Sequence, residues 1–408
     1  MNLNEVKEKL NKYNQNHLLN FFDELNETEK SALLSQIAAT DFEVIKAAYN
    51  SDNSVIKGEI SPLKAMELSE IADCKDEFLS IGIDAIKNNK VAAVLLAGGM
   101  GTRLGSSDPK GMYNIGKTKD LYIFECLINN LMDIVKLADT PIELFVMTSD
   151  KNHESTVNFL TEHNFFGYDE NYIHFFKQEM APATDFEGNI LLEEKSKMAT
   201  SPNGNGGWFT SLKRASLDNI LHDKGIEWLN IFAVDNVLQK IADPVFIGAT
   251  IKSNVAVGAK VVRKANPNES VGVMCLEDGR PSIIEYYELT DEMKEARDEK
   301  GDPAYNFGVI LNYLFSVKDL EELADNGLSL HIVKKKIDYV AANGELVKPS
   351  EPNGYKYENL VLDMIHMMSG CLPFEVVREK EFAPIKNLTG TDSVESARLL
   401  LEKNGVEL

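Results

Sequence analysis

The sequence contains few cysteines and no long hydrophobic run. Its four cysteines, Cys74, Cys126, Cys275 and Cys371, form no CxxC pair, which excludes a disulfide-rich secreted scaffold and fits a reducing cytosol. The longest apolar run, residues 91–97, is far shorter than the roughly 20 residues that cross a bilayer. The N-terminal stretch MNLNEVKEKLNKYNQ is polar, so we expect no signal peptide and a cytoplasmic protein that binds no membrane.

Positive charge is also scarce. The chain has 42 Lys and Arg against 64 Asp and Glu, a net charge of −22. Such a chain lacks the basic stripe that holds a nucleic-acid backbone, so we expect no nucleic-acid partner. A local basic cluster can still bind a small anionic substrate. The seven histidines show no spacing typical of metal ligands.

The 408 residues predict two or three domains. Residues 1–88 are expected to be helical, because Leu18, Leu19, Phe22 and Leu25 recur at helical spacing and Asn26 opens a helix-start signal. The character of the sequence changes at the apolar run that begins at residue 91. We therefore divide the chain into an N-terminal helical segment (1–88), a central domain (89–327) and a smaller C-terminal region (328–408).

The central region alternates between two kinds of pattern. Apolar runs predict buried strands over 91–97, 142–148, 173–176, 228–234 and 255–257, and helical patterns cover 121–137 and 153–163. The charged residues 290–302 predict a surface helix or loop, and an amphipathic helix is expected from about Ser393. Alternating strands and helices predict an α/β fold with right-handed crossovers.

A glycine-rich loop directly follows the first predicted strand. It reads LAGGMGTRLG over 96–105 and continues to DPKG over 108–111. Glycines there allow positive φ and close approach of a ligand to the backbone, whose N–H groups can cradle an anion. Arg103 adds a rigid fork for phosphate oxygens, and Lys110 adds a point charge.

Two other nucleotide-binding motifs fit this region less well. A Rossmann loop needs G-x-G-x-x-G, whereas Gly99, Gly101 and Gly105 are one residue too far apart, and no acidic residue ends the next strand. Residues 111–118, GMYNIGKT, match the P-loop pattern, but the residues before them form a loop where a P-loop needs a strand.

The loop resembles the LAGGxGTRLGxxxPKG motif of the UDP-sugar pyrophosphorylases, most closely the eukaryotic-type UDP-N-acetylglucosamine (UDP-N-acetylhexosamine) pyrophosphorylases. Further motifs of that family follow in order: MTS (147–149), FKQ (176–178), PNGNGG (202–207), VDN (234–236), ADP (242–244), GAKVV (258–262), VGV (271–273), IEY (284–286), KP (348–349), PNGYK (352–356) and FAPIKN (382–387). The resemblance implies a Rossmann-like nucleotide-diphospho-sugar transferase fold of the GT-A-like kind, a mixed sheet flanked by helices.

The resemblance also implies an activity. The chain is expected to form a UDP-sugar and pyrophosphate from UTP and a sugar 1-phosphate, with Mg²⁺ as cofactor. It carries no hexapeptide repeat, so we expect no acetyl-transfer activity of the kind found in bacterial relatives. A protein that binds a UDP-sugar without turnover is the alternative, and the assembly is expected to be a monomer or a dimer.

Individual roles follow from the matched positions. The implied contacts are uracil and ribose for Gly98 and Gly99, the uracil edge for Gln178, nucleoside and sugar for Gly204 and Asn205, phosphates for Arg103, Lys110 and Lys386, Mg²⁺ for Asp235, and the sugar hydroxyls or substituent for Gly272 and Glu285. Further candidates for substrate binding are Ala97, Tyr286, Asn306 and Lys356. Spacing alone is equally compatible with plainer roles. Asp235 suits a turn after its strand, while Lys356 and Lys386 suit the surface.

The sequence departs from the family pattern near the sugar. Where relatives carry Asn-Ala-Gly-Asn, this chain has NFGV over 306–309, so Val309 replaces an amide side chain. A Phe-x-Phe pair of the relatives is replaced by Leu360 and Leu362. Loss of a hydrogen-bonding group can change discrimination strongly. N-acetylglucosamine 1-phosphate is therefore the first expectation, and glucose, galactose and N-acetylgalactosamine 1-phosphates stay open.

Overall fold

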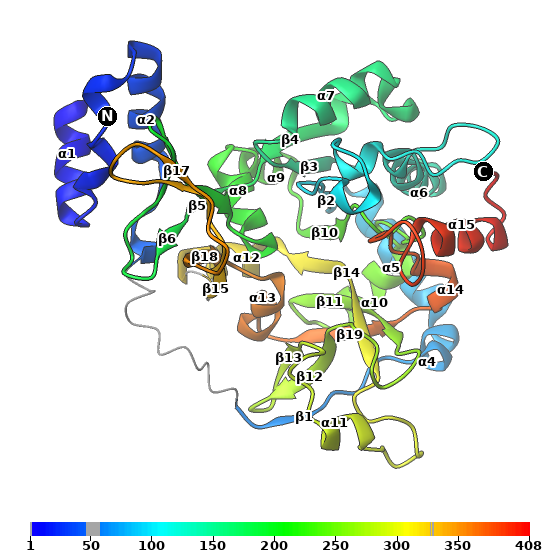
Figure 1. Ribbon diagram of the computed structural model, residues 1–408. Helices are drawn as coiled ribbons and strands as arrows, with labels where there is room; N and C mark the ends of the chain where they lie inside the picture. Colours follow the sequence, from blue (N-terminus) through cyan, green and yellow to red (C-terminus); the bar gives the residue numbers. More distant parts are fainter. Residues whose placement is uncertain (1, 46–57, 327, 329) are drawn as a thin grey trace. The chain divides into compact units, whose positions relative to one another are not determined.

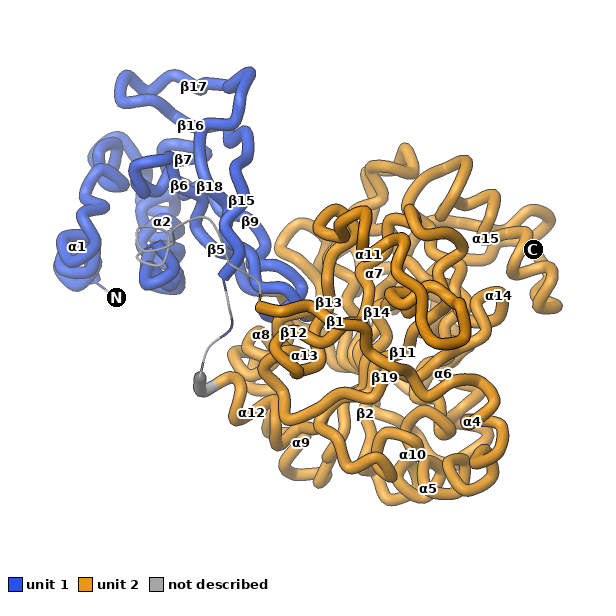
Figure 2. The backbone as a smooth tube through the Cα atoms, turned by 90° about the horizontal axis from the view of Figure 1, so that it is seen from below, with its two compact units in different colours: residues 1–56, 179–207, 328–361 blue, residues 57–178, 208–327, 362–408 orange. Residues whose placement is uncertain are grey.

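The computed structural model describes residues 2–45, 58–326, 328 and 330–408. The chain forms two compact units, shown in blue and orange in Figure 2. Unit 1 comprises residues 1–56, 179–207 and 328–361, and unit 2 comprises 57–178, 208–327 and 362–408. These units differ from the division into 1–88, 89–327 and 328–408, because strands and core residues from three distant segments pack together in unit 1.

Unit 2 is built around a mixed sheet that is ten-stranded over the described residues (Figure 1). Its strands are β1 (Ile60–Pro62), β12 (Val273–Glu277), β14 (Phe307–Ser316), β10 (Trp228–Ala233), β2 (Val91–Leu96), β3 (Leu144–Thr148) and β4 (Ile173–Lys177) in spatial order, with β13 (Arg280–Ile284) beside β12, and β11 (Val257–Arg263) and β19 (Cys371–Glu375) beyond β14. β10, β2, β3 and β4 are parallel, and β14 is antiparallel to β10.

The parallel strands determine where ligands can bind. The loops that follow β2, β4 and β10 lie at one edge of the sheet, because the carboxyl ends of parallel strands share an edge. The start of β14 reaches the same edge, since Phe232 near the end of β10 pairs with Asn312. The glycine-rich loop, Gln178, Asp235 and Val309 therefore belong to one edge of unit 2.

Helices cover both faces of this sheet. Side chains alternate along β2, so Val91, Ala93 and Leu95 enter the core with α5, α6 and α10, and the opposite face receives α8 and α12. On that face Trp208 of α8 lies 6.1 Å, ring to ring, from Phe315 of β14.

The helices of unit 2 begin with α4 (Leu68–Asp73), α5 (Lys75–Lys87), α6 (Ile123–Ala138), α7 (His153–Glu162), α8 (Trp208–Arg214) and α9 (Asp218–Lys224). They continue with α10 (Pro244–Lys252), α11 (Asp291–Glu295), α12 (Val317–Asn326), α13 (Val361–Met367), α14 (Arg378–Glu381) and α15 (Val394–Lys403). Short 3-10 turns occur at η3 (Thr102–Leu104), η4 (Lys110–Met112), η5 (Asn164–Gly167) and η6 (Glu170–Tyr172). Among the described residues, no helix combines the length and the apolar composition needed to span a membrane.

Unit 1 is smaller and mixes helices with short strands. Its helical elements are α1 (Leu3–Lys12), η1 (Asn16–Leu19), η2 (Phe22–Glu24), α2 (Glu27–Ala39) and η7 (Asn205–Gly207). Its strands pair as β15 (His331–Lys335), β18 (Gly354–Glu358) and β6 (Thr184–Asp185), as β5 (Met180–Pro182) with β9 (Thr200–Pro202), as β7 (Leu192–Glu194) with β8 (Lys197–Met198), and as β16 (Tyr339–Val340) with β17 (Leu346–Val347). The core joins side chains of α1 and α2 to Ile190, Leu192 and Met198.

Most predicted elements are confirmed. The strands predicted over 91–97, 142–148, 173–176 and 228–234 and the helices over 123–138 and 153–162 occur as expected, and Asn26 and Ser393 cap α2 and α15. The strand predicted over 255–257 begins only at Val257 and runs to Arg263. Two expectations within residues 1–88 are wrong. Residues 16–25 form two short 3-10 turns because Leu18, Phe21 and Leu25 enter the core through successive turns. Residues 60–62 form a strand because they pair with β12.

Candidate active site

The glycine-rich loop is held by hydrogen bonds from the neighbouring strands. The N–H of Ala97 donates to the carbonyl of Met147 at 2.8 Å, and Nδ2 of the buried Asn152 donates to the carbonyl of Ala97 at 2.8 Å. The N–H of Lys110 donates to the carbonyl of Gly99 at 3.1 Å. These bonds fold the loop back on itself, so residues 97–99 and Lys110 lie together at the end of β2.

Gln178 lies directly against the start of this loop. It follows β4, its backbone N–H donates to the carbonyl of Thr148 at 2.7 Å, and it is 8% exposed. A Cβ atom added to Gly98 would lie 3.1 Å from Oε1 of Gln178, whereas one added to Gly99 would meet nothing within 4 Å. The side-chain amide therefore faces the glycine backbone beside open space, which suits a planar base that reads amide and backbone groups together.

Three cations gather with the carboxylate of Asp235 at the same edge of the sheet. Burial lowers the pKa of the Lys110 ammonium, the negative charge of Asp235 opposes this decrease, and the positive charges of Arg103 and Lys386 add to it. Over the described ranges, neither Arg103 nor Lys110 has a carboxylate at ion-pair distance. The cluster thus carries more positive than negative charge, as a site for phosphate groups requires.

The segment after α14 brings Lys386 to Asp235. The N–H of Ile385 donates to the carbonyl of Asp235 at 2.8 Å, and Asn236 forms an isolated β-bridge with Pro384. The side chain of Asn236 completes the join, since its Nδ2 donates to the carbonyl of Glu381 at 2.8 Å and its Oδ1 accepts from the N–H of Ala383 at 2.9 Å. Two segments about 150 residues apart in sequence therefore form one rigid part of the site.

A buried ionic cluster lies beneath this join. Nζ of the fully buried Lys260 in β11 lies 2.6 Å from Oε2 of Glu381 and 3.1 Å from Oδ2 of Asp243. Burial acts to lower the pKa of Lys260, but the two carboxylates outweigh it and the net pKa is raised. Asp243 also caps α10 by accepting from the N–H of Val245. The cluster thus ties the sheet to α10 and to the end of α14.

The residues of unit 2 that are predicted to lie near the sugar form a second group at the starts of β12 and β14. The N–H of Val309 donates to the carbonyl of Gly272 at 2.9 Å. A Cβ on Gly272 would lie 3.5 Å from Cγ2 of Val309 and 3.7 Å from Oε2 of Glu285. Tyr286 follows, 42% exposed, with its ring 5.3 Å from that of Tyr287. Gly272, Glu285 and Val309 are therefore neighbours, as the sequence motifs imply.

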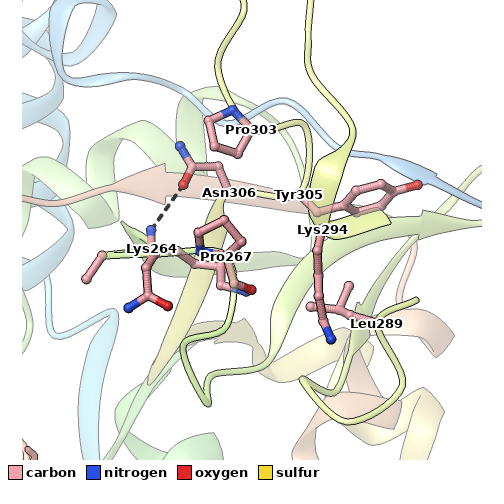
Figure 3. Close-up of a pocket in the computed structure, with 9 residues that line it drawn as sticks. Lys264, Pro267, Leu289, Lys294, Pro303, Tyr305 and Asn306 are labelled. Atoms are coloured by element: carbon pink, nitrogen blue, oxygen red, sulfur yellow. Dashed lines mark hydrogen bonds between the residues drawn. The ribbon is translucent and has the colours of Figure 1, made fainter. Parts of the chain in front are cut away.

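Asn306 lines a pocket of about 130 Å³ on unit 2. The N–H of Lys264 donates to Oδ1 of Asn306 at 3.2 Å, and this bond is drawn in Figure 3. Tyr305, Lys294 and Pro267 line the same pocket. The Asn306 amide therefore supports the turn after β11, and only its remaining hydrogen-bonding capacity is available for a substrate.

Gly204, Asn205 and Lys356 belong to unit 1. Gly204 has a φ of +85°, and an added Cβ would lie 2.2 Å from the carbonyl oxygen of Asn359. Oδ1 of Asn205 accepts from the N–H of Val361 at 3.1 Å. Both residues therefore hold the PNGNGG turn against residues 359–361, a structural role that the motif alone did not indicate. Lys356 is partly buried in β18.

Residues 111–118 do not form a P-loop. Gly111 lies within the 3-10 turn η4 rather than after a strand. Nζ of Lys117 is 2.6 Å from Oε1 of Glu402 in α15, so this lysine pairs at the surface. The structural context that the motif requires is absent from this described segment, as the sequence predicts.

Two kinds of supporting residue are not predicted by the sequence patterns. Asn152 fixes the glycine-rich loop, and Lys260 and Glu381 support the approach of Lys386 to Asp235. Lys260 stands inside the GAKVV motif, whereas Asn152 lies three residues beyond the MTS motif, and neither motif indicates the contacts that these two residues make. The position of Lys260 in the middle of an apolar strand is the one local pattern that indicates a buried ion pair.

Within the described ranges, no group of three or more His, Cys, Asp or Glu side chains could hold a metal ion alone. The structure nonetheless fits an ion shared with a substrate. The Asp235 carboxylate stands beside the cations at the end of β10, and magnesium takes one or two carboxylates and completes its shell with phosphate oxygens and water.

Comparisons with known proteins support one family. The family model described as UTP–glucose-1-phosphate uridylyltransferase matches residues 40–407. The UDP-N-acetylglucosamine pyrophosphorylase of Saccharomyces cerevisiae is 36% identical over 416 residues, covering 98% of this chain and 86% of the relative. The UDP-N-acetylhexosamine pyrophosphorylase-like protein 1 of Mus musculus is 34% identical over 410 residues, covering 94% and 80%.

A solved structure agrees with these matches. The uridine diphosphate N-acetylglucosamine pyrophosphorylase of Trypanosoma brucei, crystallised with an inhibitor, has a TM-score of 0.84 and 26% identity, and covers 98% of this chain and 84% of that one. The predicted nucleotidyltransferase fold, a mixed sheet flanked by helices, is confirmed. The predicted resemblance is confirmed as well, and the chain belongs to the UTP–glucose-1-phosphate uridylyltransferase family.

Proposed function

We propose that this protein is a nucleotidyltransferase that forms a UDP-sugar and pyrophosphate from UTP and a sugar 1-phosphate. The observation that carries the proposal is the cluster of Arg103, Asp235 and Lys386 around Lys110, at the same edge of the sheet as the Gly98–Gln178 pair. The first group suits a triphosphate and the second suits a base. Relatives that are named UDP-N-acetylglucosamine pyrophosphorylases and match almost the whole chain support the same activity.

The reaction is an in-line displacement at the α-phosphorus of UTP. An oxygen of the sugar 1-phosphate forms a new bond to phosphorus, and the bond to the pyrophosphate oxygen breaks. The attacking oxygen is already ionised, so no general base is needed. Both reactants are anionic, and the main tasks are positioning and charge neutralisation. Arg103, Lys110 and Lys386 supply the positive charge, and Lys110 supplies it from a partly desolvated position.

Mg²⁺ is the proposed cofactor. Asp235 would hold it together with phosphate oxygens, and when bound the ion would withdraw charge from the reacting phosphates. The proposal rests on the position of this carboxylate beside the phosphate-binding cations. Chelation with EDTA should abolish turnover, and added Mg²⁺ should restore it.

N-acetylglucosamine 1-phosphate is the proposed sugar substrate. Relatives with 33–36% identity carry that sugar in their names. Val309 lies beside Gly272 and Glu285, the residues proposed to bind the sugar, and gives this part of the site an apolar wall. A panel of sugar 1-phosphates, assayed by pyrophosphate release, tests the assignment. Preference for glucose or galactose 1-phosphate would show that the pocket around Val309 is built for another sugar.

A cytoplasmic location is proposed on the small number of cysteines. The chain has four cysteines among 408 residues and no CxxC pair, as expected in a reducing compartment. Fractionation of cells that express the full chain tests this point, and recovery in an oxidising compartment would contradict it.

A further inference from the structure

Asp392 contacts Lys386 twice. Its Oδ2 lies 2.9 Å from Nζ of Lys386, and its backbone carbonyl accepts the N–H of Lys386 at 2.7 Å. The same carbonyl accepts the N–H of Asn387 at 3.1 Å. One aspartate therefore fixes both ends of this lysine, the backbone that carries it and the ammonium at its tip.

The loop between these residues is closed and anchored. Asn387 and Ser393 form an isolated parallel bridge, and the N–H of Val394 donates to the carbonyl of Asn387 at 3.0 Å. Two residues within the loop have positive φ, Gly390 at 85° and Asp392 at 51°. Ser393 then caps α15 through the N–H of Ser396. Asp392 thus lies between a closed turn and the start of a helix. The backbone that carries its carboxylate is therefore fixed in position.

The ion pair between Lys386 and Asp392 is not explained by a contribution to the stability of the fold. The side chains of Lys386 and Asp392 are 39% and 28% exposed, and exposed pairs of this kind contribute little to folding. A lysine side chain has four rotatable bonds, so ordering it when a substrate binds costs conformational entropy. If the ammonium is already held in place, binding no longer has to offset that cost. An ammonium has three donors, so Lys386 can keep Asp392 as a partner while donating to a phosphate oxygen.

We propose that Asp392 is a positioning residue for the phosphate-binding ammonium of Lys386. The proposal rests on the proposed function, because Lys386 is the lysine assigned to the phosphates. Asp392 contacts no substrate in this account. It acts by holding Lys386 beside Asp235, whose carbonyl already fixes Ile385.

Asp392→Asn is the variant that isolates this role. Asparagine has nearly the same shape, and after glycine it is among the residues that best tolerate a positive φ. The backbone contacts of the carbonyl are unchanged, so only the charge on the side chain is lost. We expect kcat to fall about tenfold, with the KM for UTP changed by less than about twofold. The melting temperature should stay that of the wild type.

A double-mutant cycle with Lys386→Ala separates positioning from a general structural effect. If Asp392 acts through Lys386, Asp392→Asn should lower single-turnover rates by less than about twofold once Lys386 is gone. Glu402→Gln is the matched control, because Glu402 on α15 also pairs with a lysine, Lys117, at 2.6 Å. That control should keep the wild-type rate.

Binding of inorganic pyrophosphate, followed by calorimetry, tests the proposal without turnover. Asp392→Asn should weaken binding at least about threefold, in the direction of Lys386→Ala. Wild-type kcat and wild-type pyrophosphate affinity in Asp392→Asn would overturn the positioning role, as would an equal rate loss in the Lys386→Ala background. Absence of turnover in the wild type, with pyrophosphate binding that depends on Asp392, would instead contradict the proposed function alone.

Discussion

The backbone N–H of Ile385 donates a hydrogen bond to the carbonyl of Asp235 at 2.8 Å. This bond joins the turn after β10 to the segment that carries Lys386. The carboxylate assigned to the metal and a lysine assigned to the phosphates are therefore fixed to each other by the main chain. A change in either segment should therefore shift both side chains.

Asp235→Asn should abolish most of the turnover while leaving the protein folded. The amide keeps the shape of the side chain but removes the negative charge that a Mg²⁺ site needs, and we expect a loss of about 10²–10³-fold in kcat. Pyrophosphate release over a Mg²⁺ titration measures it. Asp223→Asn, at an exposed position of α9, serves as the control and should be fully active. A normal rate in Asp235→Asn would refute the metal assignment.

Lys110→Met should make the ligand-free protein more stable and inactive. Burial lowers the pKa of Lys110, so at neutral pH the folded state holds this proton less tightly than the unfolded chain does. Removing the ammonium removes that unfavourable contribution. The gain in the free energy of unfolding should be largest below the folded pKa and should shrink as pH rises toward the ordinary lysine value.

Urea denaturation at several pH values, together with kcat, measures both effects of Lys110→Met. Lys87→Met, at an exposed lysine of α5, is the control and should change neither quantity. A loss of stability in Lys110→Met at neutral pH would show that Lys110 is part of a stabilising interaction rather than a preformed anion site.

Two glycines should respond to alanine in opposite ways. Gly204→Ala forces a Cβ to within 2.2 Å of the Asn359 carbonyl at a φ of +85°, and we expect it to destabilise the fold by about 2 kcal/mol or more. Gly99→Ala meets nothing within 4 Å, so stability should be unchanged. Because its Cβ would enter the proposed base site, the affinity for UTP should fall. Equal loss of stability in both variants would contradict this distinction.

Lys260→Met should destabilise the protein strongly. Lys260 is fully buried between Asp243 and Glu381, and removing it leaves both buried carboxylates with only the more exposed Lys240 as a partner. Breaking a buried pair of this kind costs about 3–5 kcal/mol. Urea denaturation measures the loss. Lys252→Met is the control, because Lys252 pairs with Glu77 at the surface; it should change the free energy of unfolding by less than about 1 kcal/mol.

The effect of Lys260→Met should depend on pH. Burial acts to raise the pKa of Asp243, but the positive charges of Lys260 and Lys240 outweigh it and the net pKa is lowered. The wild type therefore has a contribution to stability that is present above the unfolded pKa of an aspartate and lost as pH falls through the folded pKa. In Lys260→Met that contribution is smaller, because only Lys240 still lowers the pKa of Asp243, so the difference between the two proteins should shrink in acid. A difference that stays constant down to the folded pKa would argue against the ionic account.

Local patterns in the sequence predicted much of unit 2. The run that begins at Val91 is apolar on both faces and is a buried strand, and Ser393 marks the start of α15 through its capping side chain. The glycine-rich loop and Asp235 were placed at strand ends because the apolar runs before them end there. Periodicity and capping act over a few residues, so a single sequence reveals them.

Contacts between distant segments had no such signal. The pairing of β18 with β6 and the composition of unit 1 depend on segments more than 100 residues apart. Asp392 and Asn152 are ordinary polar residues in sequence, and only the fold shows that they hold Lys386 and the glycine-rich loop. The family resemblance predicts which residues face the ligands, and the structure shows which residues support them.

The most direct test of the account is the reaction itself. Purified protein is incubated with UTP, N-acetylglucosamine 1-phosphate and Mg²⁺, and pyrophosphate and UDP-sugar are measured together. The account predicts equal amounts of both products, and none when either substrate is omitted. Release of phosphate from a nucleotide alone, or absence of UDP-sugar with every sugar 1-phosphate tried, would contradict it.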